Sequence, residues 1–174
     1  MGAEGDGEAL GRLFDRHADE LYRFARYCLG SSTAAEDAVQ EIFLGAWRGF
    51  GRFRGEASER TWIFAIARRV IASQLRAARR QAGAFELDPA RDASPDVSPL
   101  AAQRLDLEAS LGALPLRQRQ VFILRIVEDR SVQETASLLG RPAVWVRVTQ
   151  HRALARLREV LRRDTDRLEG GGNR

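Results

Sequence analysis

Aromatic rings and arginines stand side by side in the stretch 50–62, where they could bind nucleic acid. Arg52, Phe53 and Arg54 are consecutive, and Trp62 follows them within the same stretch. Unstacked bases lie on aromatic rings while guanidinium groups follow the phosphates, so this combination favours a single-stranded nucleic acid. The pattern predicts a surface for bases and phosphates, although packing in a core would explain most of the rings equally well.

The bulkiest rings of this half are expected to pack inside more than to touch a ligand. Phe43, Trp47 and Trp62 fall at helical spacing, where large rings usually belong to a core. The arginines that follow them have no apolar role. They form a basic stretch made of Arg68, Arg69, Arg76, Arg79 and Arg80.

A second constellation, nearer the C-terminus, has the layout of a helix-turn-helix. Residues 131–139 predict a short helix, Gly140-Arg141-Pro142 predicts a tight turn, and an arginine-bearing helix follows at once. The second helix of such a unit lies in the major groove, with its first residues at the base edges. The candidate contacts are Arg141, Ala143, Val144, Trp145, Arg147, Val148, His151, Arg152, Arg156 and Arg158. The alternative is that Trp145 and Val148 are core residues and the arginines a solvated face.

Catalytic and metal chemistry is disfavoured by the residues available. His17 lies on an apolar helical face and His151 among arginines, and neither has a metal-ligand spacing or a nucleophile nearby. Cys28 is the single cysteine, so it can form no internal disulfide and is interpreted as a packing residue. No catalytic residue, metal ligand or cofactor is predicted, and a reducing, cytoplasmic location is expected.

The charges of the chain alternate by segment. Over 174 residues there are 28 basic and 24 acidic side chains, a net charge of +4, and all the basic residues are arginine, a bias that a GC-rich genome explains better than function. Arginine and acidic counts are 4 and 9 over 1–45, 9 and 2 over 46–81, 2 and 6 over 82–109, and 13 and 7 over 110–174. Two basic blocks separated by an acidic one predict two nucleic-acid-facing surfaces.

Helical periodicity without strand alternation predicts an all-α fold. One amphipathic helix runs from Leu10 and ends before Gly30, and a second opens at a capping box over Thr33–Glu36. A glycine-rich loop at 49–55 then precedes a helix capped by Ser58. Further helices are expected at 104–113, 115–128, 131–139 and 142–163.

These elements are expected to form two small helical domains, 9–81 and 104–168. A flexible linker rich in acid and proline is predicted at 82–103, a disordered N-terminus at 1–8 and a frayed tail at 169–174. No apolar run approaches the roughly 20 residues that cross a bilayer, so no membrane insertion is predicted.

The order of these parts resembles the extracytoplasmic-function (ECF) group of the sigma-70 family of bacterial RNA polymerase sigma factors. The segments similar to region 2 of that group are 35–44 (AEDAVQEIFL), 53–58 (FRGEAS), 61–64 (TWIF) and 66–68 (IAR). The segments that resemble region 4 are 114–122 (LPLRQRQVF), 134–136 (ETA), 139–142 (LGRP), 146–147 (VR) and 151–153 (HRA).

The resemblance implies a dissociable promoter-specificity subunit of RNA polymerase and assigns roles to residues. The acidic region-2 helix of the family docks on the clamp coiled coil of the largest polymerase subunit, a role that carries to Asp37, Gln40, Glu41, Phe43 and Leu44. The loop and helix after it melt the minus-10 element and capture a flipped base, a role that carries to Arg52, Phe53, Arg54, Ser58, Trp62, Arg68, Arg69 and Arg76. The helix-turn-helix reads the minus-35 element as duplex, through Arg141, Val144, Trp145, Arg147, Val148, His151 and Arg152.

The resemblance further implies contact with the flap of the second-largest subunit, a linker that follows an RNA-like route, and an anti-sigma factor that masks both domains. Some base-reading positions depart from the family pattern. Arg69 stands where the family usually has Asn, Val144-Trp145 where it has Gly-Thr, and Val148-Thr149 where it has Ser-Arg. The promoter sequence therefore cannot be taken from relatives, and Trp145 could instead anchor a protein partner.

The competing hypothesis is a stand-alone helix-turn-helix regulator, which predicts a dimer on a palindromic site. That hypothesis leaves Asp37, Gln40, Glu41 and the aromatic loop without a role. An enzyme is disfavoured by the histidines and cysteine discussed above.

Overall fold

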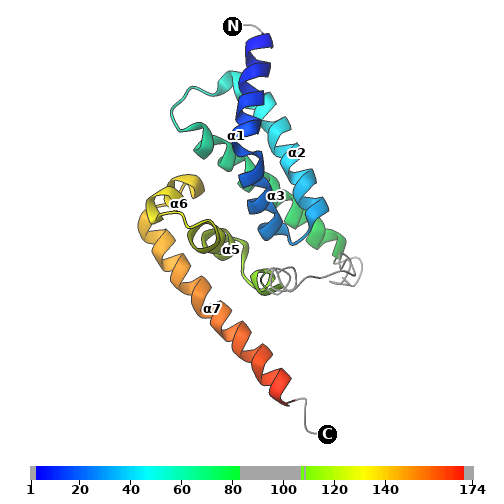
Figure 1. Cartoon of the computed structure of the whole chain (residues 1–174), viewed down its shortest axis with the longest axis vertical. Coiled ribbons are helices and arrows are strands. Elements are labelled where there is room, and N and C mark those ends of the chain that lie inside the picture. Colours follow the sequence, from blue (N-terminus) through cyan, green and yellow to red (C-terminus); the bar gives the residue numbers. More distant parts are fainter. Residues whose placement is uncertain (1–2, 83–106, 108, 171–174) are drawn as a thin grey trace.

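The described residues of the computed structural model, 3–82, 107 and 109–170, form helices joined by turns and loops, with no strand among them. This confirms the all-α fold, and Figure 1 shows the course of the chain. The elements are α1 (Ala3–Leu29), α2 (Ser32–Gly49), η1 (Phe50–Arg52), α3 (Glu59–Ala82), α5 (Leu116–Phe122), a π-helical turn η2 (Ile123–Val127), α6 (Val132–Leu139) and α7 (Ala143–Gly170). Apart from residue 82, which ends α3, the expected linker lies outside the described residues.

Both ends of the chain are more helical than the sequence predicted. α1 begins at Ala3, so residues 3–8, where disorder was expected, are helical in spite of Gly5 and Gly7, and at the end of this stretch Glu8 lies 3.6 Å from Arg12 one turn later. α7 continues to Gly170, so residues 169–170 extend the helix, and the rest of the expected frayed tail lies outside the described residues.

The cap of α2 is Ser31, and the capping box predicted at Thr33–Glu36 is wrong. Gly30 has φ of +74° and turns the chain out of α1, which leaves Ser31 extended at the start of α2. Its hydroxyl accepts a hydrogen bond from the Ala34 N–H at 3.3 Å. Ser58 caps α3 as predicted, because its Oγ accepts a hydrogen bond from the Thr61 N–H at 3.1 Å.

The helix-turn-helix is fixed by a cap at each end of α6. Ser131 and Glu134 form a capping box, with the Ser131 N–H donating to the Glu134 carboxylate at 2.8 Å and the Glu134 N–H donating to Ser131 Oγ at 3.1 Å. Hydrogen bonding of the Glu134 carboxylate to the side chain of Ser131, and to its backbone N–H, holds the pKa of Glu134 below its usual value. Gly140 ends the helix with φ of +57°, and the chain turns into α7.

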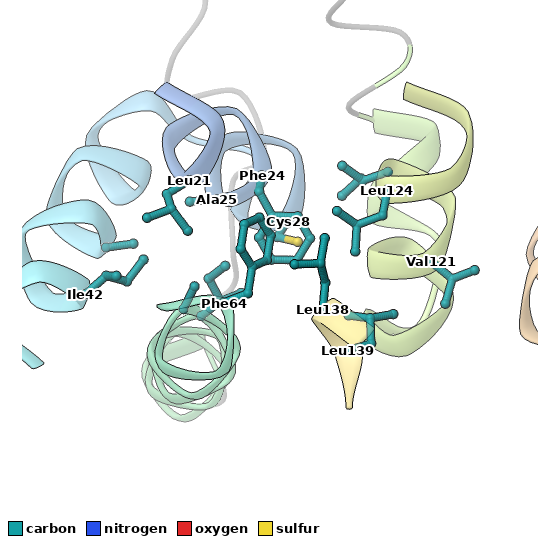
Figure 2. Close-up of a cluster of buried hydrophobic side chains, with 14 of the residues drawn as sticks. Leu21, Phe24, Ala25, Cys28, Ile42, Phe64, Val121, Leu124, Leu138 and Leu139 are labelled. Carbon is teal, nitrogen blue, oxygen red and sulfur yellow. The ribbon is translucent and has the colours of Figure 1, made fainter. Parts of the chain in front are cut away.

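The N-terminal unit (α1, α2 and α3) and the C-terminal unit (α5, η2, α6 and α7) share one apolar core. α1 packs on α2 and α3 and also reaches α5, while α3 packs against α6. Figure 2 shows Phe24, Cys28 and Phe64 on one side of this contact, facing Leu124 and Leu138 on the other. All five side chains are buried. The contact between the two units, called the domain interface below, is therefore a continuous part of the core.

The turn glycine of the helix-turn-helix gives a test of this geometry. We expect Gly140→Ala to lower the free energy of unfolding by about 1 kcal/mol, since an L side chain is strained at positive φ. The added Cβ would also meet Arg68 Nη2 at 3.4 Å. Urea unfolding followed by circular dichroism measures the change.

Gly11→Ala is the matched control. Gly11 is exposed within α1 and has open space around its Cα, so alanine there should stabilise the chain by about 0.5 to 1 kcal/mol. Changes of the same sign at both glycines would contradict the turn geometry.

Candidate nucleic-acid interface

The acidic residues of α2 lie on one exposed face. Asp37, Gln40, Glu41 and Leu44 all point to solvent from successive turns of the helix. They line a hollow of about 490 Å³ whose other wall is α3. Phe43, predicted with them, is instead almost buried and packs on Phe14, with ring centroids 4.8 Å apart. Four of the five predicted polymerase contacts therefore share a surface, and Phe43 supports it from within.

An apolar groove of about 730 Å³ adjoins this face between α1 and α2. Trp47 lines the groove and is 51% exposed, so the expectation that this ring belongs to the core is wrong. Ala46, its neighbour in sequence, takes the inward position of that turn and is fully buried. Leu44 borders both the groove and the acidic hollow. Together these residues form a surface with acid on one side and exposed apolar groups on the other.

The loop before α3 forms a small hollow floored by aromatic rings. Phe53 lies against Trp62 with ring centroids 4.8 Å apart, and Phe50 meets the same indole edge-on at 6.1 Å. The hollow measures about 220 Å³, and its lining includes Arg52, Phe53, Arg54 and Trp62. Trp62 is half-buried, so it serves both the core and this surface. Ser58, predicted alongside these residues, is exposed but takes the capping role described above.

The predicted arginines of α3 do not share one environment. Arg68, Arg69 and Arg76 line a common hollow of about 290 Å³, and Arg69 and Arg76 are exposed. Arg68 is half-buried and donates a hydrogen bond from Nη1 to the carbonyl of Leu139 in α6. Burial, with a contribution from the nearby Arg141, lowers the pKa of Arg68. In this arrangement Arg68 belongs to the domain interface.

The residues predicted to contact duplex DNA, in the turn before α7 and at its start, fall into two groups. Val144, Arg147, Val148, His151 and Arg152 are exposed. Trp145 is half-buried against the core, and the guanidinium of Arg141 lies over its ring, 5.5 Å from the centroid. The sequence alternatives are thus resolved in part: Trp145 packs inward, whereas Val148 does not.

The residues that sequence reasoning missed are the charged groups of the domain interface. The carboxylate of Glu20 is buried and accepts hydrogen bonds from Arg60 Nε at 3.0 Å and from Arg130 Nη2 at 3.2 Å. Arg60 belongs to the N-terminal unit and Arg130 to the C-terminal unit. Glu20 lies three residues after His17 and four before Phe24, on the apolar stripe of α1, and an acid in such a stripe was the available signal.

Two further arginines span the domain interface. Arg23 forms two hydrogen bonds with the Glu128 carboxylate, at 3.0 and 3.2 Å. Arg119 donates to the carbonyl of Cys28 and, at 2.8 Å, to that of Gly112. Burial lowers the pKa of Arg119 and raises the pKa of the Cys28 thiol to about 12. The Cys28 thiol is therefore protonated and shielded at neutral pH.

The part of the chain that the structure describes offers neither a metal site nor a membrane-spanning helix. Within it, no three His, Cys, Asp or Glu side chains come close enough to hold a metal ion. None of its helices is both long and apolar enough to cross a membrane.

Comparison with known families accounts for both units. Residues 13–81 match Sigma-70 region 2, and residues 104–157 match Sigma-70 region 4. Two such regions in this order define the sigma-70 class of transcription initiation factors, in which the helix-turn-helix binds DNA. The chain belongs to the ECF group of this family of RNA polymerase sigma factors, as its resemblance implied. The family is non-catalytic.

The relatives cover nearly the whole chain. The ECF RNA polymerase sigma factor SigX of Bacillus subtilis (strain 168) is 33% identical over 169 residues, which cover 90% of this chain and 87% of that protein. SigM of Mycobacterium tuberculosis (strain ATCC 25618 / H37Rv) is 32% identical over 159 residues, which cover 90% of this chain and 79% of SigM. The solved structure of CnrH in complex with the cytosolic domain of CnrY has a TM-score of 0.70 at 27% identity and covers 93% of both chains.

The shared carboxylate of the domain interface can be tested by removing its charge. Glu20→Gln leaves two largely buried guanidinium groups without a counter-charge, so we expect the free energy of unfolding to fall by about 2 kcal/mol. Urea unfolding at neutral pH and low salt measures this.

Glu159→Gln is the comparison variant. Glu159 also meets two arginines, Arg162 and Arg163, but on the exposed surface of one helix, where ion pairs contribute little. If both variants lost the same stability, Glu20 would have no special place in the fold.

Proposed function

We propose that this chain binds core RNA polymerase through the exposed face of α2 and directs the enzyme to start transcription at promoters. The observation that carries the proposal is the joint exposure of Asp37, Gln40, Glu41 and Leu44 beside an apolar groove, within a chain that matches region 2. The partner surface is the clamp coiled coil of the largest subunit. The apolar groove suits a helix whose one face is hydrophobic, and the acids suit basic residues beside it.

The loop before α3 captures an unstacked base of the minus-10 element. The hollow over Phe53 and Trp62 offers ring faces, and Arg52 and Arg54 at its rim meet the flanking phosphates. Unstacking a base costs a few kcal/mol, which the polymerase complex helps to offset by holding the DNA in place. Arg69 and Arg76 continue the basic surface along α3.

Duplex DNA of the minus-35 element lies against the exposed face at the start of α7, while another part of the C-terminal unit meets the flap of the second-largest subunit. Arg68 joins the minus-10 surface only after its hydrogen bond to Leu139 has broken. Promoter binding is therefore coupled to separation of the two units at the domain interface.

An anti-sigma factor is a further proposed partner. The similar structure CnrH is described in complex with the cytosolic domain of CnrY, and the RpoE structure, similar in fold, is described with the anti-sigma factor NepR. A protein that held the two units together would keep Arg68 away from DNA. The proposed location is the cytoplasm, at the nucleoid when the chain is bound to polymerase.

Transcription in vitro with purified bacterial core polymerase and a promoter library tests the function. The wild-type chain should produce specific start sites and migrate together with core polymerase. The double charge reversal Asp37→Arg with Glu41→Arg should abolish both, because it places positive charge on the face that meets the clamp.

Asp15→Arg with Asp19→Arg is the matched control. These two acids are also exposed one turn apart, on α1, so the change in net charge is the same. Absence of start sites with the wild-type chain would refute the proposed function. Equal loss in both double variants would refute the assigned surface.

Phe53 provides a separate test of base capture. Phe53→Ala removes a ring from the hollow and should reduce open-complex formation about tenfold, in line with the loss of one base–aromatic stack. Permanganate reactivity of thymines in the minus-10 region measures opening.

Phe50→Ala removes the other ring that packs on Trp62, but Phe50 does not line the hollow. Promoter opening by Phe50→Ala should therefore stay within about twofold of wild type, because no base–aromatic stack is lost. If the two variants opened the promoter to the same reduced extent, support of Trp62 would account for the effect.

A further inference from the structure

The first two turns of α7 carry an unusual exposed face. Val144 is 67% exposed and Val148 is 46% exposed, whereas Val146, Thr149 and Ala153 between and beyond them are buried. The helix is thus firmly anchored on one side and presents two valines, four residues apart, on the other. The two valines therefore form an exposed apolar surface that no residue of the described chain covers.

The surroundings of the two valines are basic. Arg147, His151 and Arg152 are exposed on the same part of the helix, and the next large exposed apolar side chain on α7 is Leu161, about three and a half turns away. Trp145 and Arg141 are engaged with each other and with the core, as described above. A narrow apolar strip inside a basic surface suits a DNA groove better than it suits a broad protein contact.

Valine has neither donor nor acceptor, so it can contribute to base recognition only through apolar contact. The C5-methyl of thymine is the apolar group that base edges present in the major groove. Branching at Cβ restricts the valine side chain, so little freedom is lost on contact. Four residues of helix span about 6 Å, close to two base-pair steps of about 3.4 Å each.

We propose that Val144 and Val148 are specificity residues that select thymine methyl groups at two minus-35 positions about two base pairs apart. The inference rests on the proposed function, since it concerns the same duplex surface. Arg147 lies between the two valines in sequence and supplies the polar contact, to guanine or to a phosphate. Val144 and Val148, two of the residues at which this chain departs from the family pattern, thereby acquire a role.

Deoxyuridine tests the proposal, because it differs from thymine at this edge only by lacking the methyl group. Each minus-35 thymine of a promoter selected with full-length chain and core polymerase is replaced in turn by deoxyuridine. At two positions we expect transcription at subsaturating sigma factor to fall about fourfold, the effect of one buried methyl group. Val144→Ala should abolish the difference at one position and Val148→Ala at the other.

Leu161→Ala is the control on the same helix and should retain both differences. Equal transcription from thymine and deoxyuridine templates with the wild-type chain would overturn the proposal, while start sites that depend on the minus-35 element would leave the proposed function intact. If the valine variants lost activity on every template but kept the thymine preference, the strip would be a protein contact and the proposal would be wrong. An absence of specific start sites would instead refute the proposed function.

Discussion

The buried carboxylate of Glu20 is the interaction on which the arrangement of this molecule most depends. A carboxylate held out of water needs counter-charges, and here they come from both units: Arg60 lies in the first turn of α3 and Arg130 precedes α6. Through Glu20, α1 therefore contacts charged residues of both units. Apolar residues such as Cys28 and Leu138 are buried in the same domain interface, so ion pairs and apolar packing together hold the two units against each other.

The proposed functional surfaces differ in whether their residues take part in the domain interface. The acidic face of α2, the aromatic hollow before α3 and the valine-bearing face of α7 all carry exposed residues. Arg68 alone among the predicted DNA contacts is held by a residue of the other unit. The proposed polymerase-facing surface and the proposed minus-35 surface are therefore exposed in this structure, whereas the proposed minus-10 surface lacks Arg68.

Local pattern was enough to predict much of this architecture. Periodicity located the helices, and Ser58, Ser131 and Gly140 marked helix ends, because caps and turns depend on neighbouring residues. The error at Thr33 has the same origin: Ser31 and Thr33 are both good caps, and the choice between them is made by the backbone leaving Gly30. The resemblance to sigma factors supplied the order of the two units and the residues of most surfaces.

What local pattern could not predict depends on residues far apart in the sequence. Glu20 meets partners 40 and 110 residues away, and Arg68 meets a carbonyl 71 residues away. Trp47 shows the same limit at short range, since helical spacing places it near the apolar stripe and only the packing of α1 decides that it stays outside. Whether such a side chain is buried or exposed depends on the tertiary structure and not on the local sequence.

The position of Cys28 gives the molecule a built-in reporter. It is the single thiol of the chain, it is fully buried beside the domain interface, and its pKa is about 12. An alkylating reagent attacks the thiolate, so it can react only in molecules whose helices have moved apart around this residue. The rate of Cys28 alkylation therefore reports how often the domain interface opens, without any engineered probe. A ligand that holds the two units together would lower this rate, and one that separates them would raise it.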